Sequence, residues 1–122
     1  MAGTGSRTPI VAAAIVLLVV GIASATPPDR IRLNYVDSTG TLTIAVHHPT
    51  FYAAAHHVTT IVVMLNDSLV TVQRFSGQTN NQEQDTQCVV PGARPGDRLT
   101  VTAVCSLFGK RTETLVLPTR SP

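Results

Sequence analysis

The chain has 122 residues, with 9 Lys and Arg, 7 Asp and Glu and 4 His, and a formal net charge of +2. Aromatic residues make up 4% of it, and Trp is absent. The weak charge, the lack of a basic stripe and the scarcity of stacking rings give no reason to expect nucleic-acid binding. The length fits one small domain with a single core.

The first 25 residues predict export. Residues 1–9 contain Arg7 and no acid, residues 10–22 form an uncharged apolar run, and Ala23-Ser24-Ala25 matches a small-x-small cleavage signal. The run is shorter than the roughly 20 residues of a membrane helix. We interpret residues 1–25 as a signal peptide, with an uncleaved hydrophobic helix anchoring the protein through residues 10–25 as the alternative. The protein is then exported (extracellular, periplasmic or pseudoperiplasmic), contacts membrane only through this segment, and has one domain over residues 26–122.

The rest of the chain favours strands. Tight alternation of apolar and polar side chains, or short β-branched runs, mark seven segments: residues 31–36, 41–46, 59–65, 69–75, 87–90, 98–105 and 112–117. Short strands with frequent turn signals predict an all-β, immunoglobulin-like antiparallel sandwich of about seven strands.

Turn residues punctuate these strands. Asn66-Asp67-Ser68 predicts a tight β-hairpin between residues 59–65 and 69–75. Residues 76–85 contain no apolar side chain and predict a solvent-exposed loop, whereas Pro and Gly in residues 91–97 predict a turn. Residues 47–58 are expected to connect two strands at one end of the sandwich.

All four histidines lie in that connection, as "HHPTFYAAAHHV". His48 shares the parity of Val46, and His56 that of Val58, so both are expected to project at the same end of the sandwich. Their neighbours His47 and His57 have the opposite parity. Imidazole is a favoured ligand of zinc, copper, iron and nickel. Metal ligation and exposure as ordinary loop residues are both open on this pattern alone.

Cys105 ends the strand of residues 98–105 and strengthens the metal hypothesis, because a thiolate beside two imidazoles makes a redox-capable ligand set. Residues 106–122 contain neither His nor Met, which argues against a blue-copper site.

The second cysteine is Cys88, and two cysteines in an exported protein commonly form a disulfide. However, a hairpin across residues 91–97 would pair Val90 with Arg98 and set Cys88 opposite Thr100. Cys105 would then lie about 16 Å further along the strand, whereas a disulfide needs Cα atoms within about 7 Å. We predict separate thiols, with pairing across the layers as the alternative.

Three motifs, "HHPT", "HHV" and "ARPGDRLTVTAVCSLFG", resemble the iron-binding domain of desulfoferrodoxin and neelaredoxin, the superoxide reductases. The resemblance covers residues 41–117. It implies an immunoglobulin-like sandwich that holds one non-haem ferrous ion through four equatorial histidines and an axial cysteine, with a position open for superoxide. By motif, His48, His56 and Cys105 correspond to ligands, and His47 and His57 are further candidates.

Two family ligands have no match. Phe108 stands at the position of the last histidine, and residues 26–40 contain no counterpart of the family's early Glu-Lys-His element. Together with the predicted export signal, the resemblance implies an exported, iron-binding redox protein of the superoxide reductase type, acting on superoxide or a small redox partner. The alternative is a non-catalytic exported binding or accessory module, or a sulfur-carrier-like subunit, that has lost the metal. Whether the protein is an enzyme is left open.

Overall fold

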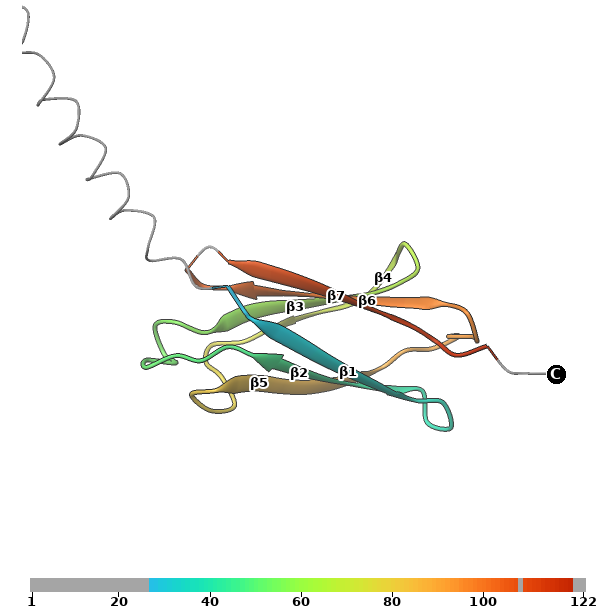
Figure 1. Ribbon diagram of the computed structural model, residues 1–122, viewed down its shortest axis with the longest axis horizontal. Coiled ribbons are helices and arrows are strands. Elements are labelled where there is room, and N and C mark those ends of the chain that lie inside the picture. Colours follow the sequence, from blue (N-terminus) through green and yellow to red (C-terminus); the bar gives the residue numbers. More distant parts are fainter. Residues whose placement is uncertain (1–26, 108, 120–122) are drawn as a thin grey trace, which may run out of the picture.

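The computed structural model describes residues 27–107 and 109–119 (Figure 1). The expected signal peptide and Phe108 lie outside these residues. Within the described ranges, no helix is long and apolar enough to cross a membrane. Seven strands follow one another in the chain: β1 (Arg30–Val36), β2 (Thr41–His47), β3 (Val58–Leu65), β4 (Ser68–Arg74), β5 (Glu83–Val89), β6 (Arg98–Cys105) and β7 (Lys110–Val116).

The strands form two antiparallel sheets that pack face to face, with the strand orders β1-β2-β5 and β4-β3-β6-β7. The predicted all-β sandwich of about seven strands is therefore confirmed. The predicted hairpin of β3 and β4 is also present, and Asn66 adopts the positive φ of 53° that its tight turn requires.

Alternation along the strands builds the core between the sheets. In β6, Leu99, Val101 and Ala103 are fully buried, while Thr100 and Thr102 lie between them on the other face. Burial of one large aliphatic side chain contributes roughly 1.5–3 kcal/mol. The core residues from both sheets are Ile31, Leu42, Ile44, Val46, Val58, Ile61, Val63, Val90, Leu99, Val101, Ala103 and Leu117.

The predicted hairpin of β5 with β6 is wrong. Residues 90–97 carry the chain from one sheet to the other, so Cys88 pairs with Leu42 of β2 and Thr100 pairs with Met64 of β3. Pro and Gly turns are compatible with either connection, which is why the sequence did not separate them. Both cysteines are nevertheless free thiols, as predicted.

The predicted exposed loop of residues 76–85 is too long. Strand β5 already begins at Glu83, and Gln84 is buried with 6% exposure. Gln84 is satisfied there by donating to the Thr79 hydroxyl and to the Asp85 carbonyl. A polar side chain can enter the protein in this way when its hydrogen-bonding groups are paired.

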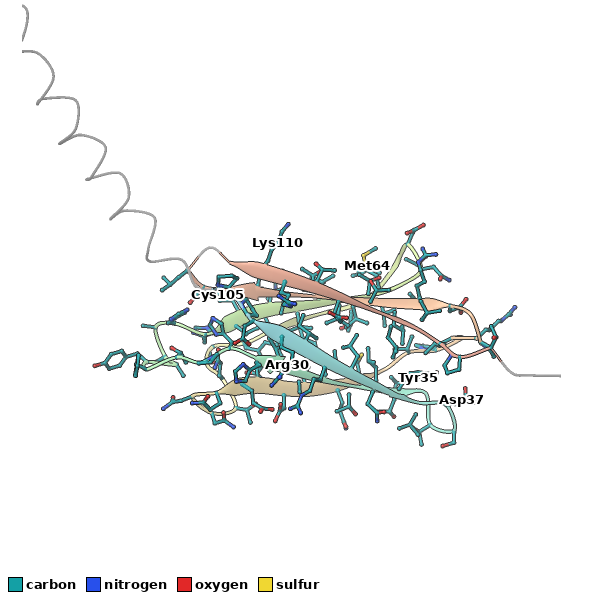
Figure 2. The ribbon with its side chains drawn as sticks, viewed as in Figure 1. Arg30, Tyr35, Asp37, Met64, Cys105 and Lys110 are labelled. Carbon is teal, nitrogen blue, oxygen red and sulfur yellow. The ribbon has the colours of Figure 1, made fainter. Side chains whose placement is uncertain are left out.

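The two ends of the sandwich differ. Cys105, Arg30 and Lys110 lie at one end, whereas Tyr35 and Asp37 lie at the other (Figure 2). The connection of residues 48–57 joins β2 to β3, as expected. It meets the end of β6 at the Cys105 end, because Val58 is the pairing partner of Cys105.

Candidate metal centre

Three of the predicted ligands converge. His48 follows β2, His56 lies in the connection to β3, and Cys105 ends β6, yet one ligand atom from each lies within 4.8 Å of the others. A bound ion with bonds of about 2.0–2.3 Å needs its ligand atoms roughly 4 Å apart or less. The three ligand atoms are therefore close to the spacing that one shared ion requires.

Backbone hydrogen bonds hold the connection of residues 48–57, which we call the histidine connection, in place. The His48 N–H donates to the Gln82 carbonyl at 2.8 Å, which extends the pairing of β2 and β5 beyond the strands. The His56 N–H donates to the Tyr52 carbonyl at 2.7 Å and closes a turn. His48 thus leaves the sheet along the strand direction, while the turn bends the chain back and returns His56 toward it.

The Cys105 thiol is fixed by the turn that follows β6. Its N–H donates to the Gly109 carbonyl at 2.7 Å, and the Leu107 N–H donates to Sγ at 3.4 Å. Cys105 is 3% exposed. A sulfur atom inside this tight turn points to a fixed place, which is a property that a metal ligand requires.

The two imidazoles contact each other edge to face. The ring centroids of His48 and His56 are 4.7 Å apart with an interplanar angle of 85°. His48 is 1% exposed, whereas His56 is only half-buried. An ion held by the three residues would be shielded by His48 and Cys105 and would be reached from the His56 side.

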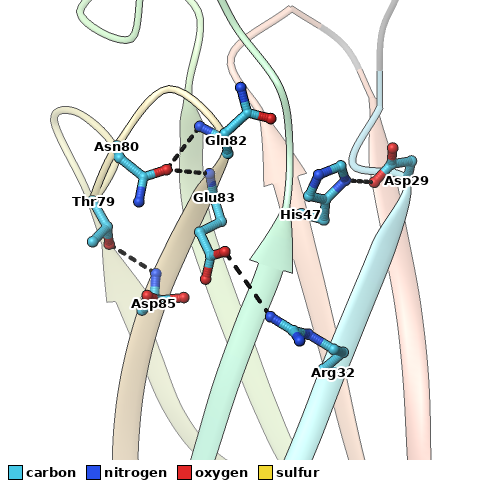
Figure 3. Close-up of polar contacts among 8 residues, drawn as sticks. All are labelled: Asp29, Arg32, His47, Thr79, Asn80, Gln82, Glu83 and Asp85. Carbon is cyan, nitrogen blue, oxygen red and sulfur yellow. Dashed lines mark hydrogen bonds and ion pairs between the residues drawn. The ribbon is translucent and has the colours of Figure 1, made fainter.

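The other two histidines lie outside the group of three. His47 Nδ1 is 2.5 Å from the Asp29 carboxylate, on the outer face of the sheet (Figure 3). His57 donates from Nε2 to the Phe75 carbonyl at 3.2 Å, and its backbone N–H donates to the Ser106 hydroxyl at 3.1 Å. These contacts give both rings structural partners.

His57 also departs from its expected orientation. Strand parity placed it with Thr59, on the outer side, but its exposure is 9% and Val58 beside it is fully buried. Two successive residues point inward because β3 begins only at Val58, and its pairing with β6 shifts register between Val58 and Thr60. Strand alternation does not extend into the preceding turn.

Gln78, which lies in the loop predicted to be solvent-exposed, contacts the candidate site. Gln78 accepts from His48 Nδ1 at 2.5 Å and from the Val58 N–H at 3.1 Å. It is half-buried. The composition of the loop around Gln78 gave no signal of this role. A polar loop that folds back over a site has the same kind of sequence as any other polar loop.

The loop that carries Gln78 is itself braced. Asn80 Oδ1 accepts from the N–H groups of Gln82 and Glu83 at 2.8 and 3.0 Å, and the Thr79 hydroxyl accepts from the Asp85 N–H at 2.8 Å (Figure 3). Such side-chain caps satisfy backbone donors that the strand ladder does not reach. They fix the start of β5 beside the site.

The outer face of the first sheet adds charge near this end. Glu83 forms an ion pair with Arg32 at 4.0 Å (Figure 3). The hydrogen bond between its carboxyl and that of Asp85, together with partial burial and the charge of Asp85, raises the pKa of Glu83 above its ordinary 4.5, against the opposing charges of Arg32 and His47. At the far end of the same strand, burial raises the pKa of the Cys88 thiol.

The donor set defines which ions fit. Thiolate and imidazole ligands suit zinc, copper and iron, whereas magnesium and calcium take oxygen ligands. Three protein ligands leave at least one coordination position for water or a substrate, as in catalytic rather than closed structural sites. His48, His56 and Cys105 thus form a buried group that could hold a transition-metal ion.

The described cavity does not belong to this site. It has a volume of about 350 Å³ and is lined mainly by residues of β1 and β7, including Leu33, Tyr35 and Leu115, and by Pro95 of the connection that precedes β6. None of the three candidate ligands lines it.

No protein-family model and no curated protein matches the chain. The ligand geometry therefore carries the functional conclusion.

Proposed function

We propose that this protein is an exported metalloprotein in which His48, His56 and Cys105 hold a single iron ion, and that its activity is of the superoxide reductase type. The approach of three ligand atoms to within 4.8 Å, from three separate elements, is the observation that carries the proposal. The thiolate and imidazole donor set suits iron, and the motif resemblance favours iron over zinc and copper. The apolar run of residues 10–22 supports export.

The candidate ligands have different roles in the proposed reaction. Bound ferrous iron would supply one electron to superoxide, which takes up two protons and leaves as hydrogen peroxide while the iron becomes ferric. Cys105 and His48 hold the buried side and exclude water from it, since their exposures are 3% and 1%. The half-buried His56 side leaves the approach for a small anion.

Metal binding by the anaerobically purified full chain tests the proposal. We expect one ferrous ion per chain, with a thiolate-to-iron absorption band after oxidation. Cys105→Ala abolishes that band, and His56→Ala weakens binding. Cys88→Ala is the matched control, because Cys88 is also a free thiol but lies near the opposite end of the sandwich. No stoichiometric binding, or equal binding by Cys105→Ala, would overturn the proposal.

Superoxide consumption by the loaded protein tests the reaction separately. Consumption that yields peroxide and requires Cys105 supports reductase activity. Stoichiometric iron without consumption would restrict the function to metal binding.

A second candidate is a binding module that works without metal. It is favoured by two highly exposed aromatic side chains in the histidine connection, Phe51 at 93% and Tyr52 at 78% exposure. Exposed aromatic residues are enriched in the centres of protein interfaces. The same metal measurement separates the two candidates, because a metal-free module binds no ion stoichiometrically.

A further inference from the structure

The Gln78 amide makes four hydrogen bonds around the candidate site. Its Oε1 accepts from His48 Nδ1 at 2.5 Å and from the Val58 N–H at 3.1 Å. Its Nε2 donates to the carbonyls of His48 and Asn80 at 3.0 and 3.1 Å. One amide therefore joins the start of the connection, at His48, to Val58 directly after its end.

These contacts determine which way the amide points. The carbonyls of His48 and Asn80 can only accept, and the Val58 N–H can only donate. Exchanging the oxygen and nitrogen of Gln78 would set two acceptors against each other and two donors against each other. The Gln78 oxygen must therefore face both Val58 and the imidazole of His48.

The amide orientation in turn determines the tautomer of His48. Because Gln78 Oε1 offers only lone pairs, Nδ1 of His48 must carry the hydrogen that they share. In the neutral imidazole the remaining lone pair then belongs to Nε2. A metal ion would be bound through Nε2, since metal-binding histidines commonly donate their other ring N–H to an oxygen acceptor.

We infer that Gln78 is a positioning residue, which sets the tautomer of His48 and holds both ends of the histidine connection in the geometry that an ion needs. The metal part of this inference rests on the proposed function, whereas the tautomer part does not. It also gives the polar loop of residues 75–82 a role, namely to deliver an amide to the buried side of the site.

Nitrogen-15 NMR of the metal-free full chain tests the tautomer directly. With histidine labelled and the pH held near 8, we expect the couplings of His48 to show a protonated Nδ1 and an unprotonated Nε2. The opposite tautomer in the wild-type protein would overturn the inference. This measurement needs neither a variant nor a metal.

Two variants then separate the functions of the amide. Gln78→Leu removes the acceptor and should give mixed His48 tautomers. Gln78→Glu keeps an oxygen acceptor for Nδ1 but loses both donated hydrogen bonds, so it should retain the tautomer at lower stability. A Gln78→Leu protein that is folded and has the unchanged, pure tautomer would overturn the role of Gln78.

Affinity for Zn²⁺, chosen because it has no redox chemistry, tests the connection to the metal. Loss of the hydrogen-bond partner of a metal-binding histidine typically weakens binding by about 10–100-fold, and we expect a loss in that range for Gln78→Leu. Gln73→Leu is the matched control. Gln73 is also half-buried, accepts from the Thr86 hydroxyl at 2.8 Å and donates to the Gln87 carbonyl at 3.2 Å, and neither of these partners is a histidine.

The outcomes distinguish this inference from the proposed function. A protonated Nδ1 together with no Zn²⁺ binding by the wild type would leave the tautomer assignment standing and overturn the metal site. Zn²⁺ binding that is equally strong in Gln78→Leu and Gln73→Leu would leave the metal site standing and overturn the positioning role.

Discussion

Removal of the Cys105 thiol should uncouple the stability of the domain from metal. An ion that binds only the native state adds RT ln(1 + [L]/Kd) to the free energy of unfolding, or about 2.7 kcal/mol at a free concentration of 100 Kd. For a domain of roughly 100 residues, 1 kcal/mol shifts Tm by about 4–8 °C, so Zn²⁺ should raise the Tm of the wild type by about 11–22 °C.

Metal binding to the unfolded chain would reduce this increase in the free energy of unfolding. The structure limits the size of that reduction. His48 and Cys105 are 57 positions apart (105 minus 48), so they are brought together only in the folded sandwich. Paired histidines in the unfolded chain retain some affinity, which reduces the shift from its upper value. The thiolate and the two imidazoles act on one ion only after folding.

Cys105→Ala has a separate, smaller effect in the absence of metal. Cys105 is 3% exposed, so losing its sulfur leaves a small cavity and costs about 1 kcal/mol. Its Tm should therefore fall by several degrees and should rise little or not at all when Zn²⁺ is added. Cys88→Ala should keep the metal-dependent shift, because Cys88 pairs with Leu42 and is not part of the ligand group.

Thermal unfolding followed by circular dichroism, with and without Zn²⁺ and under reducing conditions, measures all three proteins. A shift of the same size in Cys105→Ala and in the wild type would refute the assignment of the thiol. If Cys88→Ala lost the Zn²⁺-dependent Tm shift to the same extent as Cys105→Ala, the relevant thiol would lie near the opposite end of the sandwich from the candidate site.

Three further variants test the fold around the site. Ile61→Ala, at a fully buried position, should cost about 2–5 kcal/mol in urea unfolding through the cavity it leaves. Gly109→Ala would bring a Cβ within 2.4 Å of the Pro27 Cα, so it should cost about 1–3 kcal/mol and weaken Zn²⁺ binding by moving the turn after Cys105. Asp85→Asn should lower the pKa of Glu83 toward 4.5, measured by carboxyl NMR, because the acidic partner that raises it is gone. Since a raised folded-state pKa favours the folded state at low pH, the contribution of Glu83 to stability falls as the pH rises from 4.5 through that pKa, and this fall should shrink in the variant.

The Ile61 and Gly109 variants each have a matched comparison in the chain. Leu69 is 62% exposed, so Leu69→Ala should change stability by no more than about 0.5 kcal/mol. Gly77 has no atom within 4 Å of its Cβ position, and Gly77→Ala should leave Zn²⁺ affinity unchanged. A Glu83 pKa that does not move in Asp85→Asn would contradict the assigned cause.

The strands could be predicted because their signal is local. Alternation with period two specifies which side chains of β2 and β6 enter the core, and Asn66 marks a turn with positive φ. The partner of β5 could not be predicted in this way. A Pro and Gly turn says that the chain reverses, but packing of the core determines whether it returns in the same sheet or crosses to the other.

The candidate site, too, could be predicted only in part. His48, His56 and Cys105 could be proposed because their residue types suit a metal and strand ends carry them to one rim. Gln78 could not, because its role depends on the path of a loop rather than on residue type. The burial of His57 was missed because the alternation of a strand was applied to the turn that precedes it.

The distribution of the ligands over both sheets has a consequence for the order of folding. Closing the long loop between the histidine connection and the end of β6 is entropically costly. If the ligands meet only after the transition state, a bound ion slows unfolding and leaves the folding rate almost unchanged. An ion held by the three candidate ligands would then bind after the chain has folded, so its identity would reflect the metals available where folding ends.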